Sequence, residues 1–226
     1  MIVPAMNEKE VEAEIKKDFA RIHKSTIPRL AFEYDRERRK LKMDKTSDYN
    51  KVYQIKTAGK NQWMIFIKKG TGKPKYKQAC DGTFFCVVYY YTKQGLNVCR
   101  INYPSDDLEF FYGHFFKRYN ERQKLNLPDT LSAVKHFFNN NENFRSILSH
   151  CKNERAQPGT MFAESVCKDG LALGIHYIST WHTVYKTFIS HHLLTKNQRS
   201  VEEMLNEDSN EDVIAESYTS EKSVAA

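Results

Sequence analysis

The chain has 226 residues, of which 40% are hydrophobic, 13% aromatic and 28% charged, with 9 glycines and 6 prolines. This composition is typical of a globular protein with an aromatic-rich core and excludes collagen-like, low-complexity and disordered classes. A chain of this length buries roughly 70 per cent of its unfolded surface when it folds, so it can form a substantial core.

Charge is distributed unevenly along the chain. Residues 202–226 hold eight acidic residues against the single Lys222, a net charge of −7, whereas residues 1–201 carry 34 basic and 20 acidic residues, a net charge of +14. Such a body attracts polyanions at long range, which makes nucleic acid the leading partner class. Lysines that serve only solubility are the alternative, and a protein partner stays open.

The sequence predicts neither membrane insertion nor a cofactor. No apolar run approaches the roughly 20 residues of a membrane span, and the first residues lack the features of a signal peptide, so we expect a cytoplasmic protein. The cysteines are odd in number and have neither CxxC pairing nor zinc-site spacing, which indicates reduced thiols and no metal site. They are Cys80, Cys86, Cys99, Cys151 and Cys167.

We expect residues 1–201 to form one basic α+β domain, with a division into 1–104 and 105–201 left open, followed by a mobile acidic tail over 202–226. The first predicted element is a helix over residues 7–24, in which Asn7 is the N-cap and Glu10 completes a capping box. Its buried stripe comprises Val11, Ile15, Phe19 and Ile22.

A second helix is predicted to begin near Pro28, with Thr26 as a possible cap, because proline is tolerated in the first helical turn. It carries the charged run 35–42, which includes Arg36 and Arg39. This run is typical of a solvated helix face, and phosphate contact by the two arginines is the functional alternative.

Period-two alternation of Val, Ile, Tyr and Phe predicts an antiparallel meander. Its strands are expected at 51–56, 62–69, 83–92 and 96–103, and again at 161–168, 171–177 and 183–190. Asp169-Gly170 is the expected turn of the second hairpin.

The basic segment 68–77 contains Lys68, Lys69, Lys73 and Lys75. It lacks P-loop spacing, and Pro74 prevents a helix from following directly. We therefore predict a hairpin connection that could lie along a phosphate backbone, against the alternative of a flexible solvent loop.

Helices are predicted over 108–124 and 128–138, with a short one over 142–151, and the first two form an aromatic-rich pair on the sheet. The first helix would bury the residues at positions i, i+3, i+4, i+7, i+8 and i+11. These are Leu108, Phe111, Tyr112, Phe115, Phe116 and Tyr119. The spacing identifies this aromatic face as core.

A second stripe follows the aromatic one and consists of His114, Arg118, Glu121 and Arg122. Imidazole titrates near neutral pH and arginine binds phosphate bidentately, so the stripe could position and cleave a phosphodiester. The alternative is a ladder of surface ion pairs worth tenths of a kcal/mol.

The spelling H-x-x-x-R-x-x-E-R at His114–Arg122, followed by a helix, a hairpin and a strand, resembles small bacterial RelE-like toxin domains over residues 105–190. The resemblance implies the fold of the barnase, EndoU, colicin and RelE superfamily and metal-independent RNA cleavage. It implies His114 as acid or base and Arg118 and Arg122 as phosphate-orienting groups.

The last predicted strand adds His182 and Lys186, which share a face in regular strand geometry. A metal-free ribonuclease needs an acid, a base and a cation, and these two residues with His114 would suffice. The predicted function is thus nucleic-acid interaction with RNA favoured and cleavage by the RelE-like route. The alternatives are a non-enzymatic nucleic-acid or protein binding module and a structural or assembly protein of a phage or mobile element.

Overall fold

One mixed sheet organises the computed structural model, which describes residues 1–40, 50–69, 82–93, 95–102, 107–141, 145–149, 157–196 and 198–200. Nine strands within these ranges follow the spatial order β1-β2-β3-β4-β5-β9-β8-β7-β6. They are β1 (Asn50–Lys56), β2 (Gln62–Lys69), β3 (Gly82–Thr92), β4 (Gly95–Asn102), β5 (Asp107–Tyr112), β6 (Arg145–Ser149), β7 (Thr160–Cys167), β8 (Gly170–Tyr177) and β9 (His182–Ser190). The helices are α1 (Glu8–Arg21), η1 (Ile22–Thr26), α2 (Ile27–Lys40), α3 (Gly113–Arg122), α4 (Thr130–Asn140) and η2 (His191–Leu193).

The sheet consists of two antiparallel halves, β1–β5 and β6–β9. A parallel ladder between β5 and β9 joins them, from Leu108 opposite His182 to Phe111 opposite Tyr185. The α+β class and all seven predicted strands are confirmed. The purely antiparallel meander is wrong, because β5 leads through two helices and three strands before β9 returns beside it in the same direction.

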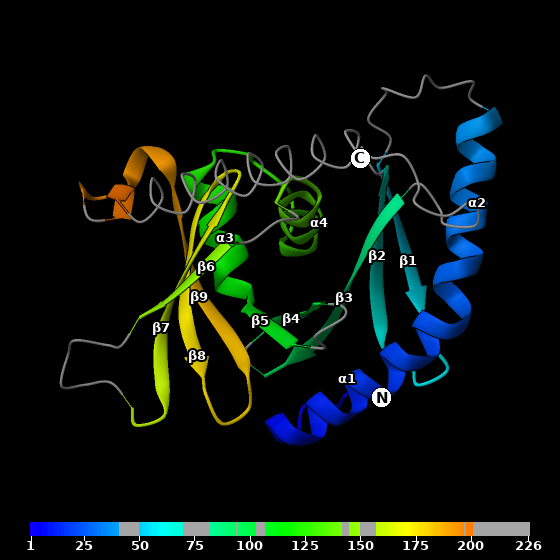
Figure 1. Ribbon diagram of the computed structural model, residues 1–226, viewed down its shortest axis with the longest axis horizontal. Coiled ribbons are helices and arrows are strands. Elements are labelled where there is room, and N and C mark those ends of the chain that lie inside the picture. The colour runs from blue at the N-terminus through cyan, green and yellow to red at the C-terminus, as the bar shows by residue number, and fades with distance from the viewer. Residues whose placement is uncertain are drawn as a thin grey trace, which may run out of the picture.

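The halves curl around α3 and α4, whereas α1 and α2 lie outside the first half (Figure 1). Each face of the first half therefore has its own apolar cluster. The inner cluster packs Met64, Phe66, Val87 and Val98 of the sheet against Phe115, Phe116, Tyr119, Val134, Phe137 and Phe138 of the two helices. The outer cluster packs Trp63, Ile65, Val88, Cys99 and Ile101 against Val11, Ile15, Phe19 and Leu30.

The start of α1 follows the sequence prediction. The amide of Glu10 donates to the side chain of Asn7 at 3.1 Å, and the amide of Asn7 donates to the carboxylate of Glu10 at 2.8 Å. The predicted cap at Thr26 is wrong, because the chain stays helical through the π-helical turn Ile22–Thr26 and continues into α2.

A buried carboxylate fixes α1 to the sheet. Asp18 is 3% exposed and accepts hydrogen bonds from the Thr57 hydroxyl at 2.6 Å, the Asn61 amide at 2.9 Å and the Trp63 indole at 3.0 Å. Asn61 in turn accepts from the backbone amide of Ile2 at 2.7 Å. The first residues, α1 and the β1–β2 turn are therefore held in one polar network.

The predicted helix over 108–124 is wrong in its first turn and a half. Residues 107–112 form β5, whose alternate side chains enter the outer and inner clusters, and the helix begins only at Gly113. A strand covered on both faces is apolar at nearly every position, so its sequence also satisfies helical spacing. Gly113 permits the close turn, because a Cβ there would lie 3.0 Å from the carbonyl oxygen of Leu96.

The short helix predicted over 142–151 is also wrong where the structure describes it. Residues 145–149 form β6 at the edge of the sheet, paired with β7. The hydroxyls of Ser146 and Ser165 lie 2.6 Å apart across this pair, and Ile147 packs against a small cluster on the outer face. The five residues of β6 are stabilised as a strand by pairing with β7, and local sequence propensity does not predict that pairing.

The acidic tail over 202–226 and most of the basic segment 68–77 lie outside the described residues. Among the helices that are described, none is both long and apolar enough to cross a membrane.

We predict that Asp18→Ala lowers the free energy of unfolding by about 3 kcal/mol, because the buried amide of Asn61, the buried indole of Trp63 and the half-buried hydroxyl of Thr57 lose their acceptor. Urea denaturation monitored by circular dichroism measures this change. Glu12→Ala is the matched control, because it removes a carboxylate of α1 that pairs with Lys16 at the surface and should cost less than about 1 kcal/mol. Equal losses in the two variants would contradict the role given to the Asp18 network.

Candidate functional site

A groove at the start of α3 contains His114, and we call it the His114 groove. It has a volume of about 680 Å³. Its lining residues are Tyr91, Gly95, Leu96, Asn97, Tyr112, Gly113, His114, Lys117, Asp129, Thr130 and Leu131. The groove therefore lies over the β3–β4 turn, between the first turns of α3 and α4.

The polar groups of the His114 groove suit an anion with an aromatic neighbour. His114 and Lys117 are exposed, and the side chain of Tyr91 is 57% exposed. The N-cap residue of α3 is Tyr112, which makes no capping hydrogen bond, so the first amides of the ten-residue helix carry no side-chain cap. Uncapped amides and the helix dipole favour negative charge at such an end.

One carboxylate also lines the groove, and it is engaged. Asp129 caps α4 by accepting from the amide and the hydroxyl of Ser132 at 2.8 and 2.9 Å. The backbone hydrogen bond from Ser132 is the main reason that the pKa of Asp129 lies below its usual value. Asp129 is therefore a fixed anion rather than a proton donor at neutral pH.

The stripe that contains His114 is divided by the fold. Arg118 is exposed one turn along α3, and within the described part of the chain it forms no ion pair with Glu121. Arg122 is half-buried and donates to the backbone carbonyl of Phe188. Desolvation lowers the pKa of Arg122. His114 and Arg118 thus face solvent, while Arg122 ties α3 to β9.

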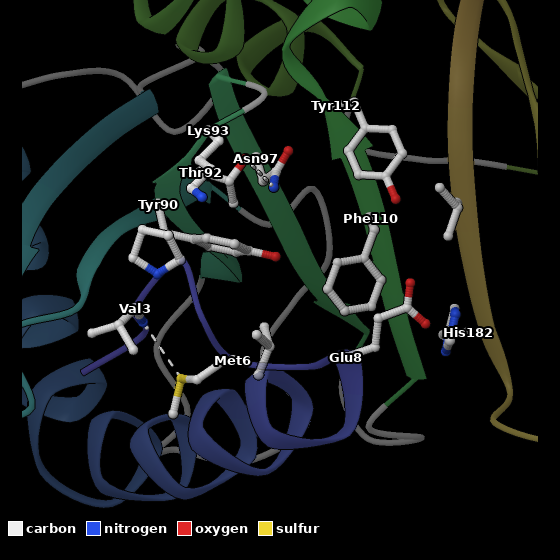
Figure 2. A pocket seen from close by; sticks show the side chains of 13 residues that line it. Val3, Met6, Glu8, Tyr90, Thr92, Lys93, Asn97, Phe110, Tyr112 and His182 are labelled. Atoms are coloured by element: carbon white, nitrogen blue, oxygen red, sulfur yellow. Dashed lines mark hydrogen bonds between the residues drawn. The ribbon is translucent and has the colours of Figure 1, made fainter.

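A second cavity lies on the outer face of the sheet beyond the first turn of α1, and we call it the His182 pocket (Figure 2). Its volume is about 340 Å³. It is lined by Val3, Pro4, Met6, Glu8, Val11, Tyr90, Thr92, Lys93, Asn97, Phe110, Tyr112, His182 and Val184.

His182 is buried in this pocket without a polar partner. It is 6% exposed, and neither ring nitrogen has a hydrogen-bond partner among the described residues. Its ring lies edge-on to Phe110, with centroids 5.5 Å apart, and 4.9 Å from the ring of Tyr177. Burial lowers the pKa of His182, which keeps the imidazole neutral.

The structure does not bring His114, His182 and Lys186 into one site. His182 pairs with Leu108 at the start of β5, whereas His114 follows the end of that strand. The two cavities adjoin, because Asn97 and Tyr112 line both.

Lys186 is an exposed residue at a β-bulge in β9. Leu173 of β8 pairs with Thr187 and Gly174 with Tyr185, so Lys186 has no partner on β8. The bulge interrupts the alternation that would place Lys186 on the face of His182.

The other basic residues singled out by the sequence lie away from both cavities. Arg36 and Arg39 are exposed on α2. Lys68 is buried and its ammonium donates to the carbonyl oxygen of Asn139 at 2.6 Å, so it joins β2 to the end of α4. The backbone of Lys69 belongs to β2, and Lys73 and Lys75 lie outside the described residues.

Several lining residues differ from what the sequence predicts. The helical spacing places Tyr112 on the buried face of a helix, and it predicts no role for Phe110, Tyr90 or Asn97. The sequence does contain one indication. If residues 107–112 form a strand, its alternation places Phe110 and Tyr112 on one face of the sheet and Phe111 on the other. Glu8 gave no signal, because its approach to β9 depends on how α1 packs.

Across the ranges that the structure describes, no cluster of three or more His, Cys, Asp or Glu side chains is placed to hold a metal ion. No protein-family model, curated protein or solved structure matches the chain.

We predict that stability falls as the pH drops from about 7.5 to about 5.5. His176 and His182 both have pKa values lowered by burial, so the unfolded chain binds more protons than the folded one below the ordinary histidine pKa of about 6.5. Their stabilising contribution is complete above that value and declines below it.

His182→Leu removes one of the two groups, so its free energy of unfolding should depend less on pH than that of the wild type. Urea denaturation at both pH values measures the difference. His192→Leu is the control, because it makes the same substitution at an exposed histidine. An unchanged pH dependence in His182→Leu would contradict the burial of a neutral imidazole.

Proposed function

We propose that this protein binds nucleic acid, with single-stranded RNA as the favoured target, at the His114 groove. The observation that carries the proposal is the combination of exposed His114 and Lys117 with the exposed ring of Tyr91 beside the uncapped end of α3. Cations and helix amides contact phosphates, while aromatic rings stack on bases that are free of a duplex.

Charge supports the same target. Residues 1–201 carry a net charge of +14, which raises the local concentration of a polyanion around the domain. Arg118 extends the basic surface of α3 by one turn beyond Lys117. The buried free thiols of Cys86, Cys99 and Cys167 accord with a reducing compartment, and we place the protein in the cytoplasm.

Metal-independent RNA cleavage at His114 is the second candidate. It is favoured by an imidazole that is exposed in a groove beside Lys117 and has no hydrogen-bond partner within the described residues. His182 and Lys186 lie elsewhere, so a second proton-transfer group would have to come from the groove or the substrate. Binding is therefore the stronger proposal.

We predict that Lys117→Ala and His114→Ala each weaken binding of a labelled single-stranded oligoribonucleotide by roughly 3- to 10-fold at low salt. Lys117→Ala should also reduce the slope of log affinity against log salt by about 0.7, the value for one phosphate contact on a single strand. Fluorescence anisotropy at several salt concentrations measures both quantities.

Lys56→Ala is the matched control, because Lys56 is exposed on β1 and lines neither cavity. Equal weakening by Lys56→Ala and Lys117→Ala would show that binding follows total charge and would contradict the groove. Gel analysis of the same RNA tests the second candidate, which requires cleavage products with the wild type and none with His114→Ala.

A further inference from the structure

Three aromatic side chains give the His182 pocket flat walls. Tyr90 comes from β3, and Phe110 and Tyr112 come from β5. The strand register aligns Tyr90 with Asn97 and Asn97 with Tyr112, so these three form a row across one face of the sheet. Figure 2 shows the rings grouped around the same space above α1. All three rings are half-buried, and each therefore keeps surface that a ligand can cover.

His182 lies beside Phe110 at one end of this space (Figure 2). Its neutral imidazole offers one donor and one acceptor, and both lack partners in the described part of the chain. The carboxylate of Glu8 lies on the side of the pocket nearest to His182 (Figure 2). Both groups are therefore open to hydrogen bonds with a ligand that enters the pocket.

The chemistry of the lining selects among ligand classes. An alkyl chain would make no hydrogen bond to His182. A phosphate beside His182 would meet the carboxylate of Glu8, because Lys93 lies at the other end of the pocket, near Thr92 and Asn97 (Figure 2). An uncharged planar heterocycle satisfies both features, because its faces stack on aromatic rings and its edge carries donors and acceptors. The volume of about 340 Å³ falls within the range of small-ligand sites.

The pocket also lies within reach of the His114 groove. Tyr112 is four residues beyond Leu108, the partner of His182, which corresponds to about 13 Å along β5. Asn97 and Tyr112 line both cavities, so a bound nucleic-acid strand could extend from one cavity to the other along the protein surface. His114 and Lys117 line the groove at which this path ends.

We infer that the His182 pocket receives a nucleobase, with His182 reading its edge and the aromatic walls stacking on its faces. The source of that base rests on the proposed function: it belongs to a strand whose phosphates contact His114 and Lys117. A free nucleotide offers the same chemistry, and the experiment separates the two sources.

The test compares a short oligoribonucleotide with a strand of equal length and charge that carries abasic sites. The wild-type protein should bind the intact strand roughly tenfold more tightly, because stacking and edge contacts are lost from the abasic strand. Tyr90→Leu and His182→Leu should remove this preference and leave the affinity for the abasic strand unchanged. Phe32→Leu on α2 and His192→Leu are the matched controls and should retain it.

Folding is checked in the same variants by thermal denaturation. His182→Leu should fold about as well as the wild type at neutral pH, because leucine keeps apolar contact with the rings of Phe110 and Tyr177. A loss of base preference in this variant then reports on the pocket and not on unfolding.

Failure of this inference can be told apart from failure of the proposed function. Equal affinity for intact and abasic strands, both weakened by Lys117→Ala, would overturn the nucleobase pocket and leave the groove in place. Absence of strand binding, with saturable binding of adenosine or uridine monophosphate that Tyr90→Leu abolishes, would support the pocket and overturn the groove. Absence of any base-dependent binding to strands or mononucleotides would overturn the inference.

Discussion

The parallel ladder between β5 and β9 is the contact on which the rest of the fold depends. Four residue pairs join the two antiparallel halves. On its inner face Phe111 stacks on Tyr185, with ring centroids 4.8 Å apart and planes at 23°, and this pair anchors the core beneath α3 and α4. On its outer face Phe110 meets His182 and forms a wall of the His182 pocket. Core and candidate site are thus built on opposite faces of the same short ladder.

The bulge at Lys186 makes this division possible. In an unbroken strand Tyr185 and Phe188 would face opposite sides of the sheet, yet both enter the inner cluster. His182 and Val184, which precede the bulge, remain on the outer face and line the pocket. A single extra residue therefore lets one strand contribute Phe188 to the aromatic core and His182 to the wall of the pocket.

Local pattern predicted most of the elements and little of their assembly. Some features depend only on a few neighbouring residues and can be predicted from the sequence. They include the capping box of Asn7 and Glu10 and the alternation of seven strands. Residues 107–112 form a strand where the sequence predicts a helix, because a strand buried on both faces is apolar at consecutive positions and also satisfies a helical period. The meeting of Phe110 with His182 spans more than seventy residues of chain, and no local pattern encodes it. His114 and Arg118 are exposed beside the aromatic face of α3, whereas their separation from His182 follows from the topology of the sheet.

The most direct test of a nucleic-acid site at the His114 groove and the His182 pocket is an NMR titration of the isotope-labelled protein with a short single-stranded oligoribonucleotide. The largest amide shift changes should map to Tyr91, Asn97, the turn from Tyr112 to Lys117, and His182. Changes concentrated around Arg36 and Arg39 on α2, with the two cavities unaffected, would contradict it.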